Sequence, residues 1–218
     1  MLNVNKPPGL TSATVVAKVK RLLGGRCKVG HAGTLDSFAT GVLLILVGRA
    51  TKRCEELMGS PKQYEATVRL GATTETLDPL SEPQPVADAI APTAEAIREA
   101  LAKQVGNVLQ LPPLFSALKV GGKRASDRTR SGETIELAPR PVRIDAIELL
   151  EYQWPDCRIR IDCGRGTYVR SIARDLGQTL QTGGYLTQLC RTRVGEFWSR
   201  DAAELDSLTR ETIATRLR

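Results

Sequence analysis

A run of six apolar residues, Val42 to Val47, follows a loop rich in glycine and constrains the fold of this chain most strongly. Such a run, closed by Gly48, is typical of a strand that is buried on both faces, so it predicts a central position in a sheet. The loop before it, residues 30–41, carries the only histidine of the chain, His31, and an acid, Asp36. Its glycines permit backbone angles that other residues resist, and they let a ligand approach the chain closely. The loop is therefore a candidate position for a nucleophilic carboxylate.

The same spacing also fits a plainer interpretation, in which Asp36 is an ordinary residue of a surface turn. Aspartate and glycine are both common in turns, because aspartate bonds local backbone groups and glycine adopts positive φ angles. On spacing alone the turn is the commoner outcome, so a functional interpretation of Asp36 needs support from other parts of the chain.

The composition predicts one globular core with an affinity for polyanions. The chain has 218 residues, with 31 Lys and Arg against 24 Asp and Glu, and its formal net charge is +7. This balance favours RNA or DNA as a partner, although many soluble enzymes are equally basic. Candidates for phosphate contact are Lys18, Lys20, Arg21, Lys123, Arg124, Arg128 and Arg130.

The cysteines and the apolar segments predict a cytoplasmic protein. The five cysteines form no C-x-x-C pair, and with a single histidine in the chain they argue against a zinc site. We expect reduced thiols, no leader segment and no membrane span, because no apolar stretch approaches the length that a bilayer requires.

Strands and helices alternate along the chain without the regular cadence of a βαβ protein, which predicts the α+β class. The expected strands have apolar residues that alternate or run together, at 1–5, 42–47, 63–70, 115–120, 142–150 and 157–163. The expected helices have apolar residues three or four apart, and they begin near residues 11, 50, 93, 167 and 201. We expect a loop over 72–92, an extended segment over 110–113, a helix end at Gly106 and a further apolar segment over 186–194.

Four stretches together resemble the TruB family of pseudouridine synthases, which in bacteria modify the T-loop of tRNA. They read NKPPGLTS at 5–12, KVGHAGTLDSFATGVL at 28–43, KQY at 62–64 and GTYVRSIARDLG at 166–177, and QLPPLFSALK at 110–119 also fits. Each motif alone is weak, but all occur in the order of the family between residue 2 and about residue 195. The resemblance favours a functional role for Asp36 over the turn interpretation.

The resemblance implies a pseudouridine synthase fold, with a central mixed and mostly antiparallel sheet flanked by helices and loops. It places a catalytic domain at 1–197 and leaves 198–218 as a short C-terminal stub, where the family has an RNA-binding domain. It implies isomerisation of uridine to pseudouridine at position 55 in the T-loop of tRNA, on a uridine flipped out of the RNA. No cofactor and no metal are expected, because the reaction adds and removes nothing. The expected partner is the T-arm of tRNA, with no membrane, and the expected state is a monomer.

The resemblance also implies roles for particular residues. Asp36 matches the nucleophile, which attacks C1′ or C6 of the nucleotide, and Arg170 matches the arginine that pairs with it. Tyr64 matches a tyrosine that stacks on the base and serves in proton transfer. The residues implied to line the base pocket are His31, Tyr168 and Leu189, and those implied to support the loop are Lys6, Pro7 and Gly33.

Plainer roles stay open for several of these residues. Without the family, Arg170 is more often an exposed helix residue, Tyr64 a core tyrosine and Lys6 a solvated lysine. The sequence departs from the family pattern at Ser37, where a proline is usual, and at Ser126, where a tyrosine is usual. Two alternatives follow: a catalytically weak RNA-binding or tRNA-folding protein on the same fold, and a hydrolase, which lacks a second acid or histidine to activate water.

Overall fold

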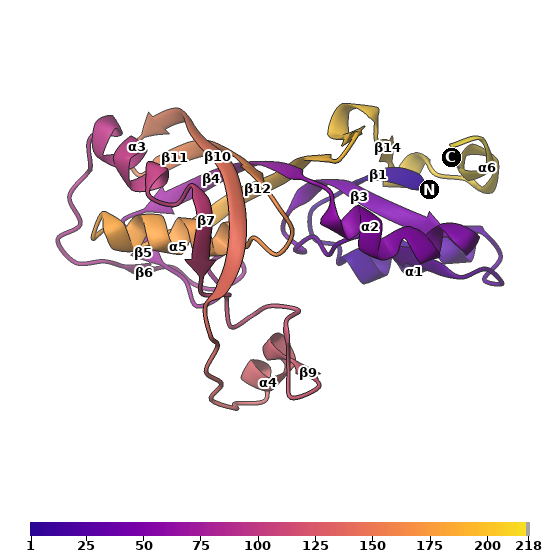
Figure 1. The fold of residues 1–218 in the computed structure, drawn as a ribbon, viewed down its shortest axis with the longest axis horizontal. Helices are drawn as coiled ribbons and strands as arrows, with labels where there is room; N and C mark the ends of the chain where they lie inside the picture. Colours follow the sequence, from indigo (N-terminus) through magenta and orange to yellow (C-terminus); the bar gives the residue numbers. More distant parts are fainter. Residues whose placement is uncertain (217–218) are drawn as a thin grey trace. The chain divides into compact units, whose positions relative to one another are not determined.

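The computed structural model describes residues 1–216, and the chain divides into two compact units. Unit 1 comprises residues 1–65 and 189–218, and unit 2 comprises residues 66–188. Strands β4 (Lys62–Leu70) and β12 (Gly184–Val194) carry the chain from one unit to the other (Figure 1). Each unit is described by itself below.

The apolar run is the central strand of unit 1, as the sequence predicts. Strand β3 (Thr40–Val47) pairs antiparallel with β1 (Leu2–Lys6) on one edge. Its other edge pairs antiparallel with β2 (Val29–His31) and parallel with the end of β12. Residues 41–46 are all buried, because hydrophobic clusters cover both faces of this strand. Unit 1 also contains the two-residue strands β13 (Phe197–Trp198), which pairs with β12, and β14 (Ala203–Glu204), which pairs parallel with β1.

Helices cover the two faces of the unit 1 sheet. Helix α1 (Ser12–Leu22) begins after the N-cap residue Thr11, as predicted, and its Val15 and Val19 pack with Leu43 and Ile45 of β3. The alternate residues of β3 pack on the other face with Leu57 of α2 (Cys54–Gly59), which follows the 3₁₀ helix η1 (Gly48–Arg53). Helices α1 and α2 therefore lie on opposite faces of β3.

The C-terminal residues differ from the helix expected at Asp201. They form η2 (Ser199–Asp201), β14, η3 (Leu205–Ser207) and then helix α6 (Arg210–Arg216). Their apolar side chains join the cluster of α1 and β1, so the pairing of β14 with a strand about 200 residues away decides their conformation. The boundary expected at residue 197 stays a prediction, and residues 217–218 of the expected stub lie outside the described residues.

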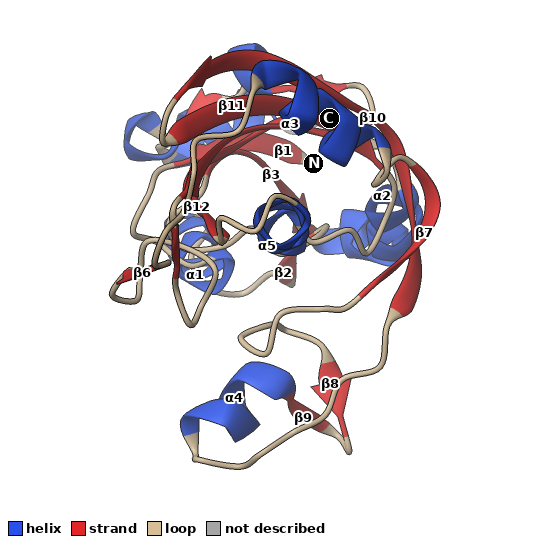
Figure 2. Ribbon diagram, turned by 90° about the vertical axis from the view of Figure 1, so that its left-hand side faces the viewer, coloured by secondary structure: helices blue, strands red, loops and turns tan. Residues whose placement is uncertain are grey.

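Unit 2 contains an antiparallel sheet wrapped around one helix. Its strands run in the order β4, β11 (Asp156–Cys163), β10 (Arg140–Gln153) and β7 (Gly106–Gln110). Buried and less buried residues alternate strictly along β4, as predicted. Figure 2 shows helix α5 (Val169–Thr179) end on, with β10, β11 and β12 curving round it, and α3 (Ala94–Ala102) packs on β10 and α5.

Three expectations for unit 2 are corrected by the structure. The segment 72–92 holds a small sheet of β5 (Ala72–Thr73) and β6 (Gln84–Pro85), and helix α3 ends at Ala102, because Gly106 begins β7 instead of closing the helix. Of the strand expected at 115–120, only the last two residues are extended. They are β8 (Lys119–Val120), which pairs with β9 (Lys123–Arg124) before helix α4 (Ala125–Arg130). Both views show this hairpin and helix projecting from the sheet of unit 2 (Figures 1 and 2).

The described residues therefore form a mixed, mostly antiparallel sheet flanked by helices, which confirms the predicted α+β class. The parallel contacts are those of β1 with β14 and of β3 with β12. No helix among residues 1–216 is long and apolar enough to cross a membrane.

Candidate active site

The loop that carries Asp36 connects β2 to β3 in unit 1, and a buried arginine holds its two sides together. Arg191 of β12 is 1% exposed. Its Nε donates to the carbonyl oxygen of Val42 at 2.7 Å, Nη1 to that of Thr34 at 3.2 Å and Nη2 to that of Gly33 at 3.2 Å. Gly41, at φ +101°, lies against the backbone of Arg191, where a Cβ atom would clash. The guanidinium is thus bonded to backbone on both sides of Asp36.

A second buried cation holds the loop immediately after Asp36. The side chain of Lys6, at the end of β1, is 0% exposed, so the solvated role considered for it is wrong. Its Nζ donates to the carbonyl oxygens of Pro7 and Leu10, both at 2.8 Å, and to that of Ser37 at 3.0 Å. The amide of Gly9 also donates to the Ser37 oxygen, at 2.8 Å. The turn that begins at Lys6 and the Asp36 loop therefore share one hydrogen-bond network.

A hydroxyl group fixes the residue before Asp36. Ser12, at the start of α1, accepts a hydrogen bond from the Leu35 amide at 2.9 Å and donates to the Leu35 carbonyl at 3.0 Å. The carbonyl of Asp36 itself accepts from the Ala39 amide at 3.2 Å. Backbone groups of four consecutive residues, 34–37, are thus bonded, while Asp36 as a residue is only partly buried. Such a loop holds its carboxylate in place without closing it off from a ligand.

The charges around Asp36 are linked. Burial lowers the pKa of Lys6 from 10.5 to about 8, the nearby Asp36 carboxylate raises it, and the Arg191 guanidinium lowers it. Lys6 therefore interacts electrostatically with both Asp36 and Arg191.

The remaining predicted residues of unit 1 lie on the strands that flank this loop. Tyr64 is on β4 and 7% exposed, Leu189 is on β12 and 6% exposed, and His31 ends β2 with its Nδ1 atom buried. The carbonyl of Leu189 accepts from the Thr40 hydroxyl at 3.5 Å, next to the parallel register of Cys190 with Thr40. The roles assigned to these side chains stay predictions.

In unit 2, the predicted arginine is buried in a cage that includes an acid. Arg170 of α5 is 5% exposed, so the exposed helix position considered for it is wrong. Its Nη1 donates to the Thr76 carbonyl at 3.0 Å and lies 3.4 Å from Oδ2 of Asp78, and its Nη2 donates to the Phe115 carbonyl at 3.0 Å. These contacts attach the segment 74–81 and the extended segment after β7 to the start of α5.

A glutamine fixes Tyr168, which lies two residues before that arginine. Gln110, at the end of β7, is 3% exposed. Its Oε1 accepts from the Tyr168 amide at 2.8 Å, and its Nε2 donates to the Tyr168 carbonyl at 3.2 Å. Tyr168 is the N-cap residue of α5, so the amide group of Gln110 sets where this helix begins.

Sequence reasoning missed two residues of these networks, Arg191 and Asp78. Arg191 lies two residues after Leu189, in the buried phase of an alternating strand, and that phase is the local signal that could have singled it out. Asp78 lies in a segment rich in Thr, Asp, Pro and Ser, where an acid is expected to be solvated. Only the folded chain shows that Asp78 is buried beside Arg170.

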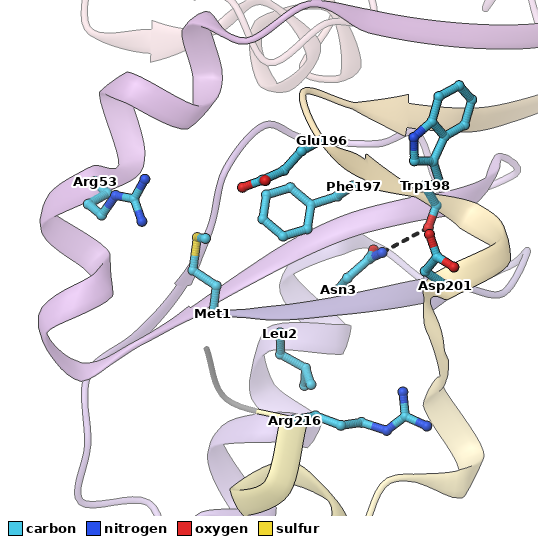
Figure 3. Close-up of a pocket in the computed structure, with 9 residues that line it drawn as sticks. All are labelled: Met1, Leu2, Asn3, Arg53, Glu196, Phe197, Trp198, Asp201 and Arg216. Atoms are coloured by element: carbon cyan, nitrogen blue, oxygen red, sulfur yellow. Dashed lines mark hydrogen bonds between the residues drawn. The ribbon is translucent and has the colours of Figure 1, made fainter.

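Unit 1 also has a cavity of about 490 Å³ among the first residues of the chain, η1 and the β12–β13 hairpin. Figure 3 shows Met1, Glu196 and Phe197 at its wall, and Asn3 donating from Nδ2 to the Trp198 carbonyl at 2.8 Å. None of the predicted site residues lines it. Among residues 1–216, no three His, Cys, Asp or Glu side chains are grouped so that they could hold a metal ion.

Comparison with known proteins shows the family. The model of the TruB family pseudouridylate synthase N-terminal domain matches residues 20–169. A tRNA pseudouridine synthase B of Phocaeicola vulgatus is 47% identical over 216 residues, which cover 95% of this chain and 90% of that relative. A tRNA pseudouridine synthase B of Mycobacterium sp. (strain KMS) is 48% identical over 212 residues, which cover 95% of this chain and 71% of that relative.

Solved structures agree with the sequence relatives. A chain in a crystal structure of a Cbf5-Nop10-Gar1 complex matches with a TM-score of 0.73 and 30% identity. The match covers 95% of this chain and 52% of that chain, so this protein spans about half the length of that neighbour. The fold is that of the pseudouridine synthases, as expected from the motifs, and the chain belongs to the TruB family of pseudouridylate synthases.

Proposed function

We propose that this protein isomerises uridine to pseudouridine at position 55 in the T-loop of tRNA, with Asp36 as the nucleophile. The observation that carries the proposal is the loop of Asp36. Its backbone is bonded at four consecutive residues, two buried cations donate to its carbonyls, and Asp36 is only partly buried. A nucleophile needs this combination of fixed position, ionised form and access to substrate.

In the proposed reaction the C1′–N1 bond of the uridine breaks and a C1′–C5 bond forms, while the proton on C5 leaves and N1 gains one. The Asp36 carboxylate attacks C1′ or C6 and is released again at the end, so the overall change is an isomerisation. In this proposal the positive charges of Lys6 and Arg191, which donate to backbone carbonyls of the Asp36 loop, favour the ionised form of the carboxylate. From the family pattern we assign Arg170 as the arginine partner of the nucleophile and Tyr64 as the group that stacks on the base and moves the C5 proton.

The substrate in this proposal is tRNA, which the names of the sequence relatives support. The formal charge of +7 supports a nucleic-acid partner in general. We propose a cytoplasmic monomer that binds the T-arm, with the target uridine flipped out of the RNA at a cost of roughly a few kcal/mol.

The proposal is tested with the purified full chain, an unmodified tRNA transcript and chemical mapping of pseudouridine. Asp36→Asn should reduce pseudouridine formation to the background level and change RNA affinity little, because the amide keeps the shape of the side chain but is not a nucleophile. Asp206→Asn is the matched control, because Asp206 is an exposed aspartate of the same unit, and it should behave as wild type.

Each result separates the candidate functions. Full turnover by Asp36→Asn would remove Asp36 as the nucleophile. A wild-type chain that binds tRNA tightly and forms no pseudouridine would instead support the RNA-binding or tRNA-folding alternative. Modification at a position other than 55 would correct the target and leave the chemistry standing.

A further inference from the structure

We propose that Arg191 is a positioning residue for this reaction: it sets the geometry of the loop that carries Asp36 and supplies buried positive charge beside it. This inference rests on the proposed function of Asp36. Arg191 acts through backbone carbonyl groups, so it is not itself a catalytic residue.

The three hydrogen bonds of Arg191 join the two ends of the loop. Gly33 and Thr34 precede Asp36, whereas Val42 lies beyond the loop in β3, and one guanidinium binds the carbonyls of all three. Arg191 therefore holds the two ends of the loop at a fixed distance from each other. The planar fork of arginine can reach several acceptors in fixed directions, which a single ammonium group cannot do.

Arg191 also lies close against strand β3. Gly41 pairs with Arg191 in the parallel register of β3 and β12, and a Cβ atom at position 41 would overlap the Arg191 backbone. The glycine thus permits a close approach of the two strands at this pair. The approach brings the guanidinium within reach of the loop that leads into β3.

The positive charge of Arg191 is not neutralised by its hydrogen-bond partners. The hydrogen-bond acceptors of Arg191 are carbonyl groups, which satisfy its N–H donors and leave its positive charge uncompensated by them. Arg191 is also one of the two charged groups that alter the pKa of Lys6, and Asp36 is the other. Lys6 therefore interacts with both groups, and the Arg191 guanidinium is bonded to Gly33 and Thr34, three and two residues before Asp36. We expect removal of this positive charge from the loop to make ionisation of Asp36 less favourable.

Two substitutions separate geometry from charge. Arg191→Lys keeps the charge and loses the fork, and Arg191→Met loses both while preserving most of the apolar stem. Arg193→Lys is the matched control, because Arg193 lies on the same strand and its guanidinium stacks on Trp198, with Cζ 5.1 Å from the ring centre. Circular dichroism and gel filtration select folded protein for each variant, and Arg191→Lys carries the test where Arg191→Met does not fold.

Pseudouridine formation is measured in single-turnover and steady-state experiments across a range of pH. We expect Arg191→Lys to lower the rate of the chemical step about 100-fold with little change in KM, since a misplaced nucleophile loses rate rather than substrate binding. In Arg191→Met the acid limb of the pH–rate profile should also move to higher pH, whereas in Arg191→Lys it should stay in place. The control should remain within about twofold of wild type, since it leaves the loop contacts intact.

The outcomes are distinct from failure of the proposed function. If the wild-type chain forms no pseudouridine, the assignment of Asp36 fails first. If the wild-type chain is active and folded Arg191→Lys reacts at the wild-type rate, the positioning role is overturned. A folded variant whose loss lies entirely in KM, or equal losses in Arg191→Lys and Arg193→Lys, would likewise overturn it.

Discussion

Each unit of this protein buries one arginine among backbone carbonyls, and the two arginines differ in how their charge is balanced. Arg191 in unit 1 donates to three carbonyl groups. Arg170 in unit 2 donates to two carbonyl groups and lies 3.4 Å from the carboxylate of Asp78, with both side chains at most 6% exposed. The first arrangement satisfies hydrogen bonds only, whereas the second also compensates charge.

The difference bears on what each arginine can do for a nearby group. A guanidinium bonded only to neutral acceptors keeps its full field, which suits a residue that stabilises an ionised aspartate such as Asp36. A guanidinium beside its own carboxylate has a weaker field at a distance but a better defined position. We therefore expect charge to matter most at Arg191 and the buried ion pair to matter most at Arg170.

The largest expected loss of stability comes from replacing the acid beside Arg170 with a neutral side chain, so that its acceptors become neutral like those of Arg191. Asp78→Asn keeps the size of the side chain and removes the carboxylate that lies 3.4 Å from the buried guanidinium, which should cost about 3 kcal/mol of unfolding free energy. Urea denaturation of the variant measures this loss. The double variant Asp78→Asn with Arg170→Met removes both charges and should lose less than the sum of the single changes. An Asp78→Asn chain as stable as wild type would show that neutral partners suffice at both sites.

A smaller effect on stability is expected at Lys6, where burial disfavours the charged form of the side chain. The pKa of its ammonium is about 8 in the folded chain and 10.5 as its ordinary value, so between these values the unfolded chain binds more protons. Stability from this group therefore rises as the pH increases from 8 to 10.5, by about 2 kcal/mol between pH 7.5 and 9.5. Lys6→Met should lack this rise, whatever its effect on stability at a single pH. Denaturation curves of the two chains at both pH values measure the difference, and parallel pH dependences would contradict it.

The parts of the fold that the sequence predicts are those fixed by local pattern. The buried run of β3, the alternation along β4 and the N-cap Thr11 all follow from neighbouring residues, and the structure confirms them. The pairing of the short strands was not predicted, because β14 pairs with β1, and β5 with β6, only in the folded chain. A strand of two residues is too short to show the alternation of apolar and polar residues from which a strand is predicted.

The candidate site divides in the same way. The motifs pointed to Asp36, Arg170 and Lys6, whereas burial of the two cations was not evident, because a lysine or arginine between polar residues is usually solvated. The carbonyl acceptors of Arg170 lie 94 and 55 positions away in the sequence, so no window of neighbouring residues contains them. The same holds for Arg191, whose acceptors lie 149 to 158 positions away.

A neutral clamp in unit 2 gives a further test, with a smaller expected effect. Gln110→Leu removes the amide group that bonds both backbone groups of Tyr168, at the start of the helix that carries Arg170. The loss should be about 1 to 2 kcal/mol of unfolding free energy, less than that of Asp78→Asn, because no buried charge is left behind. Gln104→Leu is the control, since its bond to the Ile172 carbonyl is longer, at 3.4 Å. Equal losses at Gln110 and Asp78 would contradict the distinction between neutral and charged cages.

The smallest effect is expected where cations are exposed, because water already screens their charge. Lys20 and Arg21 lie at the exposed end of α1. Such side chains act on RNA by displacing counterions from phosphates, so replacing both with glutamine should reduce the dependence of tRNA affinity on salt, by about one unit of slope for each charge that contacts a phosphate. The rate of the chemical step at saturating tRNA should be unchanged, in contrast to Arg191→Lys.

Binding measured from low to high salt tests this, with Arg98→Gln as a control that removes an exposed charge already paired with Glu95. If the salt dependence stays as in wild type, these two cations do not contact the RNA. If instead the chemical step slows, the separation between exposed cations that bind RNA and a buried cation that positions the loop is wrong.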